Sequence, residues 1–175
     1  MSEFEMFAGA ARISHPTMRL DFVAPEPFPS FRDRYEAAVP EVDLAAFASD
    51  ADWAAVRRRT AALAPHAFLR YARLDGGAFF ARAGHTTACT TYLMGNHVFA
   101  EMMFRHDPGI LLYAPLRVVI FEDKHGSTHL AVDQPSTRFA TFDNPDIAAV
   151  GRMLDERLAD LVAVLGLVAA PAVAG

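Results

Sequence analysis

The chain has 175 residues, of which 53% are hydrophobic and 21% are charged, and its formal net charge is −5. This length and composition fit one folded domain with one core, and they exclude intrinsic disorder. The negative balance argues against nucleic acid as a partner, because such binding depends on clustered cations that neutralise phosphates.

Cysteine content and the N-terminal residues bear on where the protein works. Cys89 is the only cysteine, so an internal disulfide and a cysteine-based zinc site are excluded and a reducing compartment is favoured. The first residues are acidic and lack the basic and apolar run of a secretory signal. No apolar stretch reaches the roughly 18 uninterrupted residues that a membrane span requires. We therefore expect a cytoplasmic protein without a membrane partner.

The first third of the chain predicts one strand followed by helices. Residues 1–12 show no clear period and are expected to form an N-terminal extension. Residues 13–23 predict a strand, which closely spaced prolines end. Residues 31–39 and 43–63 have the spacing of apolar side chains that is typical of helices, and a proline separates the two segments.

The remainder predicts several strands and a long final helix. Aromatic and β-branched residues predict strands over residues 68–74, 78–82, 86–94, 111–122 and 128–133. A short helix is expected over residues 97–105. In the last helix Asn144 is the expected N-cap and Pro145 the first helical position, apolar residues recur every three or four positions, and Gly166 is the expected stop.

This order of elements predicts one α+β domain. An antiparallel β-sheet packs against the long C-terminal helix, and additional helices lie near the N-terminus. The alternating strand and helix units of an α/β protein are absent from the pattern. The domain is expected to cover residues 13–168, and residues 169–175 are expected to form a flexible tail.

Several stretches in the second half of the chain resemble a known bacterial family. They are Tyr92-Leu93-Met94-Gly95-Asn96-His97, Met103-Phe104-Arg105-His106-Asp107, Leu112-Tyr113-Ala114-Pro115-Leu116-Arg117-Val118 and Val132-Asp133-Gln134-Pro135-Ser136. They resemble the family of domain of unknown function 302, best over roughly the last ninety residues. The resemblance implies a TATA-binding-protein-like α+β fold with a curved antiparallel sheet, and it implies no established activity. The family typically has proline after Gly-Asn, where this chain has His97. Either the site has gained a titratable group here, or a surface position has changed without a functional role.

His106 is a candidate acid or base. If residues 97–105 are helical, one stripe of the helix carries Phe99, Met102, Met103 and His106. This stripe points His106 toward the core at the C-terminal end of the helix. The helix dipole favours the imidazolium there and burial disfavours it. The structural alternative is a packed histidine that pairs with Asp107 or a backbone carbonyl.

His97 is the second candidate and the one most open to metal chemistry. It shares a helix face with Glu101, which suits an acid/base couple or two metal ligands, although no His-Glu-x-x-His pattern is present. Haem binding is an equal alternative, in which His97, His106 or the Met102-Met103 pair would be axial ligands. The sequence has no Cys-x-x-Cys-His motif for covalent attachment of haem.

Arg117 lies within an apolar predicted strand and shares a face with Tyr113. A charge in that position needs a partner. The partner is either Asp133 or Glu122 in a structural ion pair, or an anion or carbonyl of a ligand in a cleft.

The leading hypothesis is a protein that binds an apolar small molecule, bearing a carbonyl or carboxylate, in a pocket between sheet and helix. The predicted ligand-binding residues are Tyr92, Asn96, Phe99, Met103 and Phe121. The alternative is an isomerase, cyclase or hydratase of the same pocket, in which His106 or His97 transfers the proton and Arg117 or Tyr113 stabilises negative charge. Our first expectation is that the protein has no cofactor, and the second is that it binds haem. A homo-oligomer is a further possibility.

Overall fold

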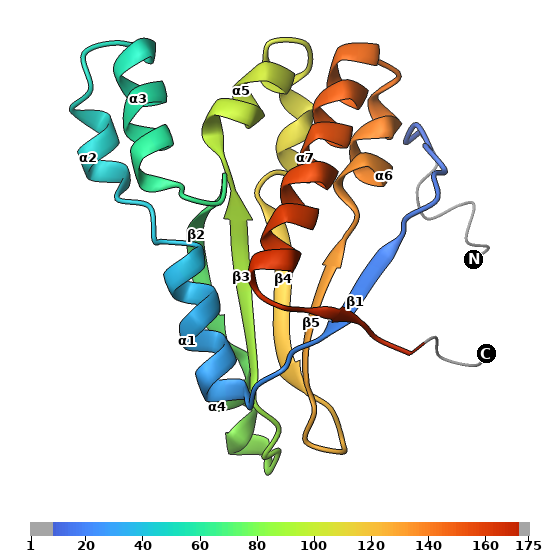
Figure 1. The fold of residues 1–175 in the computed structure, drawn as a ribbon. Coiled ribbons are helices and arrows are strands. Elements are labelled where there is room, and N and C mark those ends of the chain that lie inside the picture. The colour runs from blue at the N-terminus through green and yellow to red at the C-terminus, as the bar shows by residue number, and fades with distance from the viewer. Residues whose placement is uncertain (1–8, 172–175) are drawn as a thin grey trace.

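Six strands form one antiparallel sheet in the computed structural model, which describes residues 9–171 (Figure 1). The strands are β1 (Arg19–Val23), β2 (Leu69–Asp75), β3 (Cys89–Gly95), β4 (Leu116–Glu122), β5 (Thr128–Asp133) and β6 (Val168–Ala169). Their order across the sheet is β2-β3-β4-β5-β1-β6, and every neighbouring pair is antiparallel. The predicted α+β class with an antiparallel sheet is confirmed.

Seven helices accompany the sheet in the described residues. They are α1 (Phe28–Ala38), α2 (Leu44–Ala48), α3 (Trp53–Leu63), α4 (Gly76–Phe80), α5 (His97–Phe104), α6 (Pro135–Phe139) and α7 (Pro145–Val164), with short 3₁₀ turns η1 (Ala81–Ala83), η2 (Pro108–Leu112) and η3 (Ala140–Phe142). Figure 1 shows α1 and α7 in front of the strands, and the side of the sheet that they cover is the buried one. No helix in residues 9–171 is both long and apolar enough to cross a membrane.

Strand alternation explains why the core lies on that side only. Successive side chains of a strand point to opposite faces of the sheet. Val118 and Ile120 of β4 and Leu130 of β5 are buried beneath the helices, whereas Val119 and Ala131 between them stay partly exposed on the other face. The molecule therefore has two layers, one of helices and one of strands, with its core between them.

The long helix α7 forms as the sequence predicts. The side chain of Asn144 accepts hydrogen bonds from the backbone N–H groups of Asp146 and Ile147, and Pro145 occupies the first turn. The apolar stripe of the helix, including Leu154, is buried against the sheet and α6. Gly166 follows the helix with a positive φ of 58°, a conformation that glycine adopts without strain.

Some predicted strands are wrong or shorter than expected. Residues 78–82 form α4 and η1 rather than a strand, because the Asp75 carboxylate accepts from the N–H of Ala78 and caps a helix. The strand expected from residue 13 begins at Arg19, and the strand expected from residue 111 begins at Leu116.

Two further differences concern helix ends and the C-terminal segment. The single helix expected over residues 43–63 is two helices, α2 and α3, since Asp52 accepts from the N–H of Ala55 and starts a second helix there. Ala169, which the sequence places in a tail, pairs with Phe22 as part of β6. Residues 1–8 of the expected extension and residues 172–175 of the expected tail lie outside the described residues.

Candidate functional site

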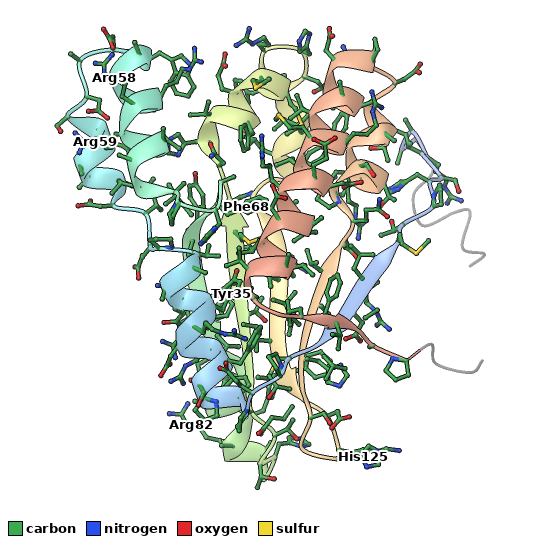
Figure 2. All side chains as sticks on the ribbon, in the orientation of Figure 1. Tyr35, Arg58, Arg59, Phe68, Arg82 and His125 are labelled. Atoms are coloured by element: carbon green, nitrogen blue, oxygen red, sulfur yellow. The ribbon has the colours of Figure 1, made fainter. Side chains whose placement is uncertain are left out.

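An apolar cavity of about 200 Å³ lies at one end of the sheet, where β2 and β3 meet α5. Side chains from β2, α5, η2, α6 and α7 and the segments between them enclose it, and the larger ones are Phe68, Tyr71, His97, Phe99, Met103 and Phe139. Figure 2 shows Phe68 at the upper part of the molecule, above Tyr35. Carbon atoms form almost all of the lining, so the cavity suits an apolar occupant.

Asn96 fixes the start of α5 and hence the side chains that reach the cavity. Its side-chain oxygen accepts hydrogen bonds from the N–H groups of Val98 and Phe99, as the sequence predicts for an N-cap. Its amide group donates to the carbonyl of Ala67 at 2.8 Å. Asn96 thus ties the helix to the segment that precedes β2, which places His97 and Phe99 at the cavity wall.

Tyr71 reaches the same wall because β2 is irregular. The pairing of β2 with β3 shifts register between Arg70 and Ala72, which leaves Tyr71 in a bulge. A bulge redirects the side chain of the extra residue. The hydroxyl of Tyr71 consequently lies 2.7 Å from Nδ1 of His97.

A chain of hydrogen bonds runs from Tyr71 through His97 to Thr60 of α3. Oγ1 of Thr60 donates its one proton to the carbonyl of Val56 at 2.8 Å, so it can only accept from Nε2 of His97, 2.6 Å away. With its proton on Nε2, the neutral ring accepts at Nδ1 from the Tyr71 hydroxyl. All bonds in the chain therefore point in one direction, an arrangement in which each bond strengthens the next.

Burial keeps the members of this chain uncharged. It lowers the pKa of His97 below its ordinary range and raises the pKa of Tyr71 to about 12. The rings of Phe47 and Trp53 meet the His97 ring edge to face, with centroids 4.5 and 6.4 Å away. At neutral pH the imidazole and the phenol both carry no net charge.

Four of the residues predicted from sequence come together at this cavity: Asn96, His97, Phe99 and Met103. Tyr92 is buried elsewhere in the core, where its ring packs against Tyr35 and its hydroxyl donates to Glu36 at 2.7 Å. Its role in the structure is to connect the sheet to α1.

His106 does not point into the core as its helical stripe predicts. Because α5 ends at Phe104, His106 lies outside the helix and is exposed, with Nε2 3.8 Å from the carboxylate of Asp146 at the start of α7. It takes no part in lining the cavity.

Tyr113 and Arg117 line a separate cleft of about 340 Å³, on the other side of the segment that joins η2 to β4. The Tyr113 hydroxyl lies 3.2 Å from Nε2 of His15. Neither of the partners expected for Arg117 pairs with it among residues 9–171, and the Asp133 carboxylate is held by Arg138.

Phe121 lies near the opposite end of β4, on the sheet face without helices. It stacks on the ring of His129 with centroids 5.1 Å apart. The residues that the sequence predicts as one site therefore lie in five different places of the fold.

Tyr71 and Thr60 are the site residues that sequence reasoning missed. The bulge that redirects Tyr71 leaves no mark in the alternation of β2, and Thr60 is polar on a helix that looks solvent-facing. The burial of Thr60, 2% exposed, depends on the docking of α3 against α5, which only the tertiary structure supplies.

The site does not fit a haem or a metal ion. Both ring nitrogens of His97 are engaged by Tyr71 and Thr60, and the Glu101 carboxylate pairs with Arg105 at 2.5 Å. No group of three or more histidine, cysteine or acidic side chains within residues 9–171 could hold a metal ion. A cavity of about 200 Å³ is also far smaller than a macrocycle of four pyrrole rings would need.

A wider hollow of about 470 Å³ lies on the far side of Asn96 and Phe99, toward α3 and α7. Its charged lining residues, Arg57, Arg157 and Asp160, are exposed, and the last two pair with each other at 3.4 Å. Its cations face water and none is buried, so the cavity with the apolar lining is the better candidate for a specific site.

The geometry first defines a class: a two-layer α+β protein whose antiparallel sheet carries helices on one face and a small apolar cavity at one end. Within that class the chain belongs to the family called Domain of unknown function DUF302, which matches residues 47–165. This confirms the resemblance seen in the sequence.

A solved structure agrees with the fold. It is that of an uncharacterized conserved protein DUF302 from Bacillus stearothermophilus, with a TM-score of 0.61 and 11% sequence identity, and the similarity covers 83% of this chain and 95% of that one. At this identity the similarity shows the fold alone. No curated protein matches the sequence.

Proposed function

We propose that this protein binds a small, uncharged and mainly apolar molecule in the cavity between α5 and the sheet. The observation that carries the proposal is a carbon-lined, partly open cavity of about 200 Å³ at the end of the sheet. Four residues that the sequence singles out as ligand-binding or catalytic contribute to its wall.

The size of the cavity sets the size of the ligand. An apolar cavity of about 150 Å³ holds a benzene molecule. A space of about 200 Å³ therefore suits a molecule of one ring with a short substituent, or an aliphatic chain of similar volume. Larger ligands would require α5 or the η2 segment to move.

The lining also sets the charge of the ligand. No cationic side chain lines the cavity, and burial lowers the pKa of His97, its one titratable base. An unpaired carboxylate transferred into such a space costs far more free energy than a neutral group. Of the carbonyl and carboxylate ligands expected from sequence, the carboxylate class is therefore disfavoured.

A matched ligand series tests the proposal. Toluene and acetophenone are expected to raise the melting temperature of the protein and to shift NMR signals of Phe99 and Met103, while benzoate is not. Binding to the native state alone stabilises it by about 2.7 kcal/mol at a ligand concentration one hundred times the Kd. No response to any of the three ligands would contradict the proposal.

A cavity-filling variant supplies the control. Ala100 of α5 lines the cavity, so Ala100→Phe is expected to fill it and to abolish the response to toluene. Ala149→Phe places the same ring on the exposed face of α7 and is expected to bind like the natural protein. An Ala100→Phe variant that folds and still binds toluene would rule out this cavity as the site.

The hydrogen-bond chain favours a second function, an enzyme that transfers a proton in the same cavity. Its residues Tyr71, His97 and Thr60 form a continuous path, with Tyr71 and His97 at the cavity wall. An isomerase of this kind is expected to lose nearly all activity on carbonyl substrates in Tyr71→Phe and to keep its ability to bind toluene. Activity unchanged in that variant would exclude the relay.

The cytoplasm is the location we propose. Cys89, the only cysteine, is a free thiol, which is usual in a reducing compartment. Cell fractionation with a periplasmic and a cytoplasmic marker protein tests this point.

A further inference from the structure

The face of the sheet opposite the helices is uncovered in residues 9–171, and it forms a regular grid. Three residues each from β1, β3, β4 and β5 point to this side, and none of them is buried. We call these residues the open face: Arg19, Asp21, Val23, Cys89, Thr91, Leu93, Arg117, Val119, Phe121, His129, Ala131 and Asp133.

Strand register arranges the open face in three rows that run across the strands. The pairings of β3 with β4, β4 with β5 and β5 with β1 place each member beside the next. From β3 to β1 the rows are Leu93-Arg117-Asp133-Arg19, then Thr91-Val119-Ala131-Asp21, then Cys89-Phe121-His129-Val23. Each row has its midpoint between β4 and β5.

The charges of the open face balance. Two arginines, Arg19 and Arg117, face two aspartates, Asp21 and Asp133, while the chain as a whole carries −5. A surface of zero net charge attracts neither a strongly acidic nor a strongly basic partner, and it can meet a copy of itself without accumulating like charge. Arg117 is exposed and has no ion pair among residues 9–171, although Asp133 lies beside it.

We propose that the open face is the contact surface between two copies of this chain, related by a two-fold axis parallel to the strands between β4 and β5. This operation exchanges the two halves of every row. Arg117 then faces the partner's Asp133, Val119 faces the partner's Ala131, and Phe121 faces the partner's His129. Arg117 then meets a carboxylate of which Arg138 of its own chain engages only Oδ2. Small apolar side chains meet at the centre, as a self-complementary interface requires.

The other two-fold axis in the plane of the sheet, perpendicular to the strands, gives a poorer match. It exchanges the first and third rows and keeps each strand opposite its own copy. Asp21 would then face the partner's Asp21, and Arg117 would face the partner's Phe121. Like charges directly opposed across an interface are destabilising, so the parallel axis is the arrangement that the sequence of the open face fits.

Sedimentation velocity and native mass spectrometry test the interface. The natural protein is expected to be a dimer in the micromolar range. Val119→Asp places a buried carboxylate at the centre of the interface, so it is expected to weaken dimerisation at least about tenfold while leaving the circular dichroism spectrum of the folded chain unchanged. Arg157→Asp changes the charge of an exposed arginine on α7 and is expected to leave the dimer intact.

A charge exchange tests the axis itself. Arg117→Asp and Asp133→Arg each place like charges across the two-fold axis, so each variant alone is expected to be monomeric. An equimolar mixture of the two is expected to form a heterodimer, because both contacts then join an aspartate to an arginine. Heterodimer formation would support the axis.

Three outcomes would overturn the inference. The first is a natural protein that stays monomeric at about 200 μM, far above the micromolar range expected here. The second is a dimer that Val119→Asp leaves unchanged. The third is a pair of folded charge variants that do not combine when mixed. Circular dichroism of each variant distinguishes a lost interface from a lost fold. None of these results depends on a ligand in the cavity, so the dimer is tested independently of the proposed ligand binding.

Discussion

His97 forms hydrogen bonds through both ring nitrogens and is more basic in the unfolded chain than in the folded one. Its ordinary pKa is about 6.5, and burial lowers it in the folded state. As the pH falls through and below about 6.5, the unfolded state takes up a proton first. The free energy of unfolding is therefore expected to decrease as the pH falls from 7.5 toward the lowered pKa of His97.

Urea unfolding at several pH values, compared between variants, isolates this effect. His97→Gln removes the titration, so its stability is expected to depend less on pH between 7.5 and 5.5 than that of the natural protein. His125→Gln is the matched control, because His125 lies exposed in the turn between β4 and β5. Equal pH slopes in the His97→Gln and natural proteins would show that the burial of His97 has no energetic consequence.

The contact between α6 and α7 depends on a glycine in the middle of the long helix. A Cβ atom added at Gly151 would lie 3.2 Å from Cβ of Phe139 and 3.2 Å from Cα of Ser136. Helix propensity predicts that Gly151→Ala stabilises the protein by about 1 kcal/mol. We expect the opposite, a loss of about 1–3 kcal/mol, because α6 must shift to admit the methyl group.

Urea unfolding measures the sign of this change. Ala149→Gly, at an exposed position of α7, reports the propensity of the same helix without a packing change, and it is expected to cost about 1 kcal/mol. A stabilised Gly151→Ala variant would show that the two helices are packed loosely enough to accept the methyl group. Since Phe139 also lines the cavity, its altered packing is expected to weaken toluene binding as well.

Local stability is expected to vary across the whole molecule in line with the two-layer arrangement. The strands β3, β4 and β5 lie between paired neighbours and beneath α7, so their backbone N–H groups open only with global unfolding. The helix α2 has no buried residue, and β6 has only two residues at the sheet edge. Hydrogen exchange monitored by mass spectrometry is expected to be slowest in β4 and fastest in α2 and β6, and uniform protection would contradict this prediction.

The site could be predicted in part from sequence. Asn96 is recognisable as an N-cap by its type and position, and the stripe of α5 correctly brings Phe99 and Met103 to one face. The same stripe gives a wrong prediction for His106, because α5 ends at Phe104, two residues before His106. Arg117 and Tyr113 lie near the cavity in the chain, but the segment between η2 and β4 separates their cleft from it.

Sequence alone determined the elements whose signals are local: the cap and stripe of α7, the hairpin of β4 and β5, and the order of elements that defines the α+β class. Such signals depend on hydrogen bonds and side-chain spacing within a few residues. Only the tertiary structure showed the cavity and the hydrogen bonds of His97 with Tyr71 and Thr60. It also showed that one face of the sheet carries no helix among residues 9–171. These features depend on a bulge and on the packing of segments that are distant in the chain. Neither leaves a local pattern in the sequence, because the free energy of packing depends on how well two surfaces fit together and not on one residue alone.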